Sequence, residues 1–360
     1  MRRSATLPSR GTSTSIVVAV CLATLSAVAG GCAGGTAVRP TPHATSSLVQ
    51  HVWAVSSFLV LSSSDGGSDW FRQRVPSRGS LTDIADIDGT SLLSVSVIGA
   101  ILRSTDAGAT WQQQYKAAGA SLTGVASDGA DDCCAVGAWS RSLPTITGGV
   151  VLGSTDGGLH WRVLWQNSAR ARGAAGVQDP ADLACPTAAC IWVAGSTGAG
   201  AEGGYVSVSQ DGGRHWRTKT FQGANCTAIS ATDAQHAWLT RGAAILATSD
   251  GGHTWQVQGR GTGQLHALAD ITMLPDGHGA AVGDSGPILT TVDWGKTWTE
   301  RVYSGPDLEL RGVAFADDLH GWAVGERRTV LATTDGGMNW TLQTHGAHFE
   351  YLYAVCASQP

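Results

Sequence analysis

The stretch TVLATTDGGMNW, at 329–340, joins a short apolar run to Thr-Thr-Asp-Gly-Gly and ends on a tryptophan. Its central pattern, Ser/Thr-x-Asp-x-Gly-x-x-Trp, occurs seven times in the chain. Successive aspartates are separated by 41, 50, 55, 39, 43 and 42 residues. Self-similarity at a nearly constant period indicates a repeat architecture. The seven motifs are SSDGGSDW (63–70), STDAGATW (104–111), STDGGLHW (154–161), SQDGGRHW (209–216), TSDGGHTW (248–255), TVDWGKTW (291–298) and TTDGGMNW (333–340).

Each motif has a mechanical interpretation as a turn between two strands. The aspartate can accept hydrogen bonds from backbone N–H groups of its own turn, and the glycine can adopt a positive φ. The tryptophan covers the hairpin, and its N–H can still reach an acceptor. The pattern resembles the Asp-box, also called the bacterial neuraminidase repeat, at all seven positions. We assign a structural role to Asp65, Asp106, Asp156, Asp211, Asp250, Asp293, Asp335, Trp70, Trp111, Trp161, Trp216, Trp255, Trp298 and Trp340.

The longer unit around each turn predicts the fold. The last complete unit, at 308–345, contains four short strands, A to D: LRGVAFA, GWAVG, TVLATT and WTLQT. Four strands in roughly 42 residues is the period of a propeller blade. The first unit begins at HVWAV (51–55) without a strand A, and LYAVCAS (352–358) supplies one at the other end. The sequence predicts an all-β, seven-bladed β-propeller over 48–360, with four-stranded antiparallel blades and a C-terminal strand that completes the N-terminal blade, because a closed ring has no open sheet edge.

Seven such units behind an export signal resemble the photosystem II stability and assembly factor family. The resemblance rests on GWAVG followed by an apolar strand and an Asp-box, and it covers about residues 48–358. It implies a non-enzymatic protein that binds other proteins during assembly. The repeat is less specific to photosynthesis than to the propeller, since related propellers occur widely in exported bacterial proteins.

The first 47 residues have the features of a targeting segment. Arg2 and Arg3 precede the apolar run Ser15–Ala29, which ends in VAGGC (28–32). This resembles a bacterial lipoprotein signal, residues 1–32, with Cys32 as the acylated residue. Simple secretion and a retained membrane anchor are the alternatives; the run is short for a span. The composition of residues 33–47 predicts a flexible tether. We expect an exported protein, either a cell-envelope lipoprotein or a secreted one.

The two long spacings point to a binding face. In an A–B–C–D blade the A–B and C–D turns share one face, and the insertions near 138–149, 166–182 and 196–204 all fall on the opposite one. Insertions on one face of a repeat array often mark its binding surface. Arginine with exposed tryptophan suits protein recognition or an anionic ligand, although solvated loops are the alternative interpretation. The candidate residues are Trp139, Arg141, Trp165, Arg170, Arg172, Arg241, Arg327 and Arg328.

No pattern of catalytic, metal-binding or cofactor-binding residues emerges, so we expect no enzyme, no cofactor and no metal. The net charge of −5 argues against nucleic acid. A sialidase-like enzyme would carry an early Arg-Ile-Pro segment, which is absent, and other glycosidases need two carboxylates across a cleft. Asp83, Asp182 and Asp270 occupy equivalent positions in three A strands. They predict either a partial carboxylate ring for a cation or, preferably, turn or inter-strand hydrogen bonds.

The cysteines predict one disulfide. An exported protein permits disulfides, and CPTAAC (185–190) joins strands A and B of one blade. Cross-strand neighbours approach closely enough to bridge, so we expect Cys185 to pair with Cys190. Outside the predicted signal peptide with Cys21 and Cys32, buried thiols are the default for the other four cysteines, whose pairing the sequence leaves open: Cys133, Cys134, Cys226 and Cys356.

These features support three functional hypotheses. The first is a membrane-tethered, exported propeller that binds a protein partner through its insertion-bearing face. The second is a carbohydrate-binding or glycoside-cleaving propeller, and the third is a purely structural envelope protein. The fold itself does not choose between them.

Overall fold

The computed structural model describes residues 50–142, 145–167, 179–197, 203–261, 267–284, 288–301, 303, 309–344 and 350–358. The predicted signal peptide with Cys32 and the tether lie outside these residues. The described part contains no helix that is long and apolar enough to cross a membrane.

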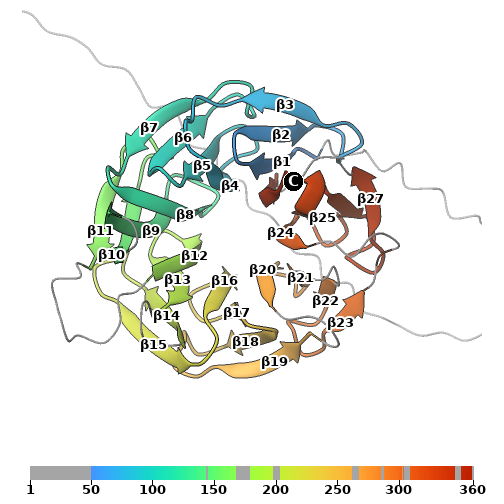
Figure 1. Ribbon diagram of the computed structural model, residues 1–360. Coiled ribbons are helices and arrows are strands. Elements are labelled where there is room, and N and C mark those ends of the chain that lie inside the picture. Colours follow the sequence, from blue (N-terminus) through green and yellow to red (C-terminus); the bar gives the residue numbers. More distant parts are fainter. Residues whose placement is uncertain are drawn as a thin grey trace, which may run out of the picture. The chain divides into compact units, whose positions relative to one another are not determined.

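Seven four-stranded antiparallel sheets surround a central axis as the blades of a propeller (Figure 1). Each blade runs outward from strand A at the axis to strand D at the rim, and in every sheet but that of blade 1 the strands follow one another in chain order. Blade 1 contains β28 (Leu352–Ala357), β1 (Val52–Ser56), β2 (Leu59–Ser63) and β3 (Phe71–Arg74), and blade 2 contains β4 (Leu81–Asp86), β5 (Leu92–Ser96), β6 (Ala100–Ser104) and β7 (Gln112–Lys116). Blade 3 contains β8 (Ala120–Ser127), β9 (Cys133–Ser142), β10 (Thr145–Ser154) and β11 (Arg162–Gln166), and blade 4 contains β12 (Asp179–Thr187), β13 (Cys190–Ser196), β14 (Gly203–Ser209) and β15 (Arg217–Gln222). Blades 5 to 7 are β16 (Cys226–Ala231), β17 (Ala237–Arg241), β18 (Ala244–Thr248), β19 (Gln256–Arg260); β20 (Leu268–Met273), β21 (Gly279–Gly283), β22 (Ile288–Thr291), β23 (Thr299–Arg301); β24 (Leu310–Phe315), β25 (Gly321–Gly325), β26 (Val330–Thr333), β27 (Thr341–Thr344), with a short 3-10 turn η1 (Glu326–Arg328) after β25.

The hydrophobic core is divided among the spaces between blades. Seven clusters of buried side chains can be distinguished, and each joins two neighbouring blades. The B strands are buried throughout because blades cover both of their faces; Trp53, Trp192 and Trp322 on these strands are completely buried. The D strands at the rim are largely exposed. This gradient explains why the apolar runs GWAVG and TVLAT recur, whereas D strands are polar.

The ring closes as the sequence predicts. Strand β28 pairs antiparallel with β1, with Val52 opposite Ala357 and Val55 opposite Ala354. Blade 1 therefore takes its innermost strand from the opposite end of the sequence. The side chains of both segments join one cluster with β25 and β26 of blade 7.

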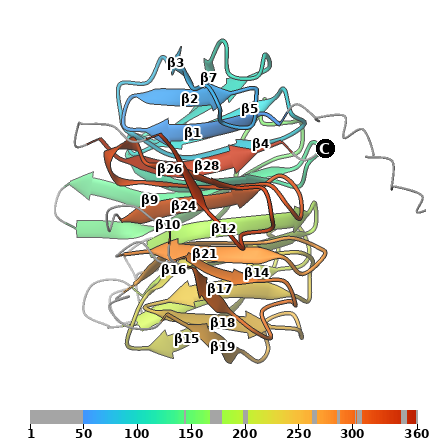
Figure 2. The same ribbon diagram turned by 90° about the vertical axis from the view of Figure 1, so that its right-hand side faces the viewer.

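The two faces of the ring differ in what they carry. We call the face of the A–B and C–D turns the Asp-box face, and the opposite one, with the B–C and D–A connections, the insertion face. Strands β9 and β10 are ten residues long and project beyond their neighbours on the insertion face (Figure 2). The predicted loop near 138–149 is thus largely an extension of a hairpin, in which Trp139 pairs with Ala120 and Gly148.

Candidate functional site

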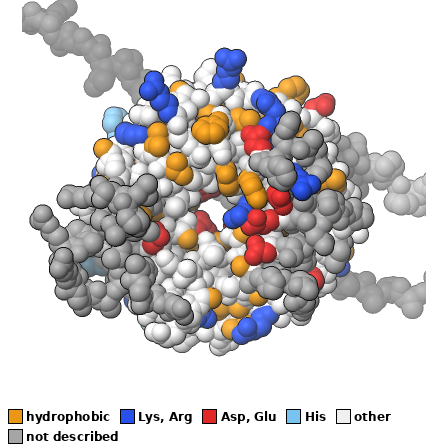
Figure 3. Space-filling model, in the orientation of Figure 1, with side chains coloured by type: hydrophobic (Ala, Val, Ile, Leu, Met, Phe, Trp, Pro, Cys, Tyr) orange, Lys and Arg blue, Asp and Glu red, His pale blue; other side chains and the backbone are white. Residues whose placement is uncertain are grey.

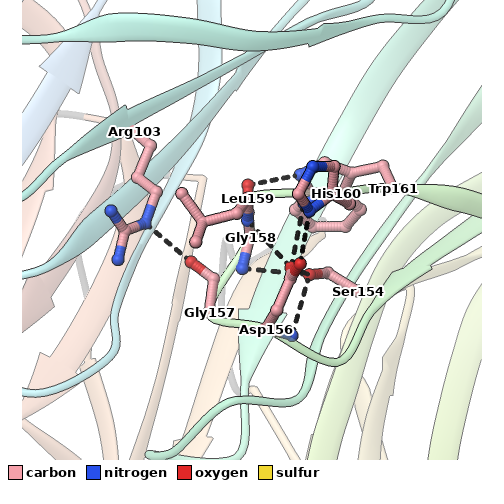
Figure 4. A network of polar contacts seen from close by, with 8 residues as sticks. All are labelled: Arg103, Ser154, Asp156, Gly157, Gly158, Leu159, His160 and Trp161. Atoms are coloured by element: carbon pink, nitrogen blue, oxygen red, sulfur yellow. Dashed lines mark hydrogen bonds and ion pairs between the residues drawn. The ribbon is translucent and has the colours of Figure 1, made fainter.

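The seven Asp-box motifs form the C–D turns of the seven blades, and each turn is held by its own side chains. The Ser or Thr hydroxyl donates to the aspartate Oδ1 at 2.8–2.9 Å in every turn. The same Oδ1 accepts from the amide four residues later at 2.8–3.0 Å. Figure 4 shows this arrangement around Asp156 in blade 3. These contacts satisfy the turn internally and leave the motif a structural role.

The tryptophans that end the motifs cover the turns, but they use their N–H groups unequally. The indoles of Trp161, Trp216 and Trp340 donate to the second glycine of their own turn at 2.9–3.1 Å. Within the described residues, the other four indole nitrogens are buried without an acceptor: Trp70, Trp111, Trp255 and Trp298. The prediction of an N–H acceptor therefore holds for three turns. Covering the hairpin is the feature that all seven share.

The turns also join neighbouring blades. The residue after each aspartate has a left-handed backbone. In four turns its carbonyl accepts a hydrogen bond from a side chain of the preceding blade. Arg103 of blade 2 donates to the carbonyl of Gly157 at 2.7 Å (Figure 4). Trp53 of blade 1 donates to Ala107 at 2.8 Å, and Trp322 of blade 7 donates to Gly66 at 3.1 Å. A turn that is complete in itself thus also receives a donor from the preceding blade.

The candidate tryptophans of the insertion face pack against the hydrophobic core and are not fully exposed. Trp139 on β9 is half-buried against the cluster between blades 2 and 3, and Trp165 on β11 against the one between blades 3 and 4. The Arg241 guanidinium lies 5.6 Å from the ring centre of Phe221, and its Nε donates to the Ala224 carbonyl at 3.1 Å. These three residues support the fold. The side chain of Arg141 and the residues Arg170 and Arg172 lie outside the described part.

Arg327 and Arg328 stand apart from the other candidates. Both have a left-handed backbone, with φ of 54° and 56°, which is uncommon for residues other than glycine. Arg328 forms an ion pair with Glu350, and its amide donates to the Glu350 carbonyl at 2.9 Å. Ser56 Oγ donates to the other oxygen of the same carboxylate at 3.1 Å. The strained turn therefore connects blade 7 to the residue that precedes the closing strand.

Further polar and aromatic side chains surround this pair. Arg311 lies over the ring of Tyr351 at 5.6 Å and pairs with Glu309. Tyr351 stacks on Tyr353 with ring centres 6.2 Å apart. Figure 3 looks onto the insertion face, where acidic and basic side chains gather around the central hollow, mostly on one side of it. We call Glu309, Arg311, Glu326, Arg327, Arg328, Glu350, Tyr351 and Tyr353 the charged rim.

Sequence reasoning identified only part of this rim. Arg327 and Arg328 were found because they lie in a B–C turn. Glu309, Arg311 and Glu326 were missed, since ordinary charged residues at strand ends give no signal. A Glu-Tyr pair such as Glu350 and Tyr351 would also suit a sialidase, but in the structure the Glu350 carboxylate pairs with Arg328 and accepts from Ser56.

Asp182 and Asp270 line a cavity of about 650 Å³ in the central channel, and Asp83 occupies the equivalent strand position in blade 2. Each of them connects two blades. Asp83 accepts from its neighbour Ile84 and from Val125 of the next blade, both at 2.8 Å. Asp182 joins Leu183 to Ile229 at 2.7 and 2.8 Å, and Asp270 joins Ile271 to Val313 at 2.8 Å each. The structure supports the inter-strand hydrogen bonds that were preferred over a cation ring, and within the described residues no group of three side chains could hold a metal ion.

A bulge in strand A makes these bridges possible. The register shifts immediately before each aspartate, between Leu81 and Asp83, between Pro180 and Asp182 and between Leu268 and Asp270. A bulge bends a strand and re-aims the adjoining side chain. Here it lets one carboxylate reach across to the neighbouring strand A, where Gly124, Ala228 and Gly312 stand in the equivalent positions.

Burial controls the protonation of the channel aspartates. It raises the pKa of Asp182 to about 6, against two backbone hydrogen bonds that lower it. Burial and repulsion from Asp182 raise the pKa of Asp270 to about 7, and the same two causes raise that of Asp83 well above its usual range. Loss of water thus outweighs hydrogen bonding in the channel.

The predicted disulfide is wrong in this structure, because Cys185 and Cys190 are both free thiols. The A–B turn is tight, and Thr187 lies opposite Cys190. Cys185 precedes Thr187 by two residues on β12, so it does not face Cys190. The two side chains belong to different clusters, Cys190 with blade 5 and Cys185 with blade 3. A hydrogen bond with Cys134 and burial raise the pKa of Cys185. The remaining cysteines of the described part are free as well: Cys133, Cys134, Cys226 and Cys356.

Comparison with solved structures shows the propeller fold. YCF48 bound to D1 peptide matches 74% of this chain and 82% of its own at a TM-score of 0.55 and 17% identity. YCF48 from Cyanidioschyzon merolae matches 74% and 86% at 0.54 and 19%. The GH74 xyloglucanase from Xanthomonas campestris matches 83% of this chain and 53% of its own at 0.58 and 15%. No protein-family model and no curated protein matches the chain.

Proposed function

We propose that this chain is an exported, non-enzymatic propeller that binds a protein partner through the charged rim on its insertion face. The observation that carries the proposal is the pair Arg327 and Arg328, both held in a left-handed conformation. Backbone strain at residues other than glycine gathers at functional sites, because folding alone does not favour it. Arginine and tyrosine beside one another are also the side chains most enriched at protein interfaces.

The rim has the chemistry of a recognition surface rather than of a hydrolase. The Glu350 carboxylate is occupied by Arg328 and Ser56, and Glu309 by Arg311. A glycosidase needs one carboxyl group free to donate a proton and another free to attack or to activate water. The similarity to YCF48 bound to D1 peptide agrees with a protein-binding propeller, and the similarity to a xyloglucanase makes glycoside hydrolysis the alternative to test.

Site-specific cross-linking tests the binding proposal. The side chain of Arg327 is 42% exposed, so a photo-reactive residue can replace it. We expect a discrete adduct in cells from position 327, and none from position 214, where an exposed arginine lies on the Asp-box face. Arg327→Glu should lower partner capture at least tenfold, and Arg214→Glu should leave it unchanged. Equal adducts from both positions would contradict the proposal, as would hydrolysis of fluorogenic glycosides.

Export and lipid attachment are separate parts of the proposal. An acylated Cys32 would leave the propeller on a membrane surface at the end of the tether, residues 33–47. Mass spectrometry of the mature N-terminus should show a lipid-modified cysteine, and Cys32→Ala should release the protein from the membrane fraction. A mature chain that begins elsewhere and is recovered in the medium would favour simple secretion.

A further inference from the structure

One Asp-box turn departs from the other six. In TVDWGKTW the position after Asp293 holds a tryptophan, Trp294, where five motifs have glycine and one has Ala107. The backbone there has φ between 54° and 72° in all seven turns, and 65° at Trp294. A bulky residue at such a φ is a real outlier, and an observed outlier is a reason to look for a function.

The indole of Trp294 packs against a glycine and two aromatic rings. It lies beside Gly277 in the A–B turn of blade 6, where an added Cβ would come within 2.7 Å of the ring. The ring of Trp238 is 6.1 Å away at an angle of 31°, and that of His236 is 6.3 Å away at 55°. Trp294 remains half-exposed, so one part of the ring packs and another faces outward.

The junction between blades 5 and 6 differs from two other junctions in the hydrogen bond that its strand B indole makes. At those junctions an indole on strand B donates to the turn of the next blade, as Trp53 does to Ala107. At this junction Trp238 donates instead to the side-chain oxygen of Gln258 at 3.0 Å. A cavity of about 470 Å³ lies here, within the size range of small-molecule sites.

The lining of this cavity combines an aromatic face with groups that donate and accept. Its polar members include Asp233, His236, Thr254, Gln256, Gln258 and Lys296. Hydrogen bonds from His236 and from the amides of Gln235 and His236 outweigh burial and lower the pKa of Asp233, so its carboxylate is ionised near neutral pH. Since the Asp233 carboxylate and the Lys296 ammonium offset each other in the same lining, a neutral ligand suits the cavity better than an ion. The density of polar groups disfavours an apolar side chain.

From this geometry we infer that the pocket between blades 5 and 6, on the Asp-box face, binds one or two sugar rings of a neutral glycan. The C–H face of a sugar packs on the outward part of the Trp294 indole, and its hydroxyls exchange hydrogen bonds with Gln256, Thr254 and Asp233. The site lies on the face opposite the charged rim. It is therefore independent of the proposed protein binding.

The decisive variant restores the shared turn sequence. Because glycine suits the left-handed backbone, Trp294→Gly should fold and unfold at an equal or higher temperature than the parent. We would titrate the full chain by calorimetry with cellobiose, maltose and N,N′-diacetylchitobiose. We expect at least one to bind, Trp294→Gly to weaken that binding at least tenfold, and Gln256→Ala to weaken it three- to tenfold. The control is Gln112→Ala, the same strand position in blade 2, which should change nothing.

Three outcomes would overturn the inference. The first is that none of the three sugars binds, and the second is that Trp294→Gly binds as the parent does. The third is a fall in the melting temperature of Trp294→Gly, which would make Trp294 a packing residue. Cross-linking at position 327 should be the same in parent and Trp294→Gly. A failure of one proposal therefore leaves the other intact.

Discussion

Asp182 and Asp211 belong to the same blade, and each accepts hydrogen bonds from two backbone amides. Folding nevertheless raises the pKa of Asp182 and lowers that of Asp211. Asp182 accepts two backbone amides at 2.7 and 2.8 Å in the channel. Asp211 accepts two at 2.9 and 3.0 Å on the Asp-box face, together with Ser209. Burial raises the pKa of Asp182 to about 6, whereas hydrogen bonds from the amide and ring of His215 lower the pKa of the exposed Asp211. Burial therefore decides the pKa in the channel, whereas the amide, hydroxyl and imidazole donors decide it in the turn.

The largest consequence is a loss of stability above neutral pH. The pKa values of Asp182 and Asp270 are raised by folding, so their favourable contribution is present below about pH 4 and is lost as the pH rises through 6 to 7. We expect the free energy of unfolding to fall by about 3 kcal/mol in all between pH 5 and pH 8. Urea unfolding at both pH values measures it. In Asp182→Asn/Asp270→Asn the dependence should shrink by about that amount while Asp83 keeps its own contribution, and an unchanged slope would contradict this assignment.

A direct comparison of the two aspartates in blade 4 comes next in size. Asp182→Ala removes the acceptor of two amides in different blades, and an unpaired buried group costs about 1–3 kcal/mol. Asp211→Ala removes a contact within a single exposed turn and should cost less. Unfolding at pH 5, where the Asp182 carboxyl is mostly uncharged, compares the two without the effect of ionisation. Equal losses would mean that the bridge between blades adds nothing beyond a turn.

The turn aspartates should govern stability at acid pH. Hydrogen bonds from His160 lower the pKa of Asp156 to about 2, and the other six turn aspartates are lowered as well. Their contribution is present above about pH 4 and is lost as the pH falls toward 2. With the channel effect, this predicts maximal stability between about pH 4 and 6. Asp156→Asn should reduce the acid-side slope, and melting curves from pH 2 to 5 would reveal a variant that does not.

The smallest expected effect concerns the turn of blade 2. Ala107 has φ of 54°, where glycine is favoured. Ala107→Gly should raise the free energy of unfolding by at most about 1 kcal/mol. The matched control is Ala109→Gly, two residues later in the same turn and outside the left-handed region. Stabilisation by both changes would mean that the left-handed φ of Ala107 is not the cause, because glycine destabilises through the unfolded chain.

The sequence predicts those parts of the molecule that depend on neighbours along the chain. Asp-box turns and four-strand blades are local, so a repeat of short motifs is sufficient to find them, and closure follows from one missing strand. The bridge from Asp83 to Val125 depends on a bulge, and the position of Cys185 on a two-residue turn. Neither the bulge nor the two-residue turn is marked by a particular residue type in the sequence. Glu350 meets Arg328 only because β28 crosses to blade 1. Trp294 in a glycine position, by contrast, is a local signal visible in the sequence.

The closing strand also bears on the order in which the protein folds. Six blades can form from hairpins whose strands are neighbours in sequence, and each can add to the one before it. Blade 1 has to wait for a segment that is made about 300 residues later, since the amide of His51 meets Ser358 across 307 positions. Contacts of such separation form slowly, because the entropy of a long loop must be overcome first. Until then the β1 edge and the blade 7 surface that β28 covers remain bare, and the last step of folding is the one that removes the edge most open to pairing with another chain.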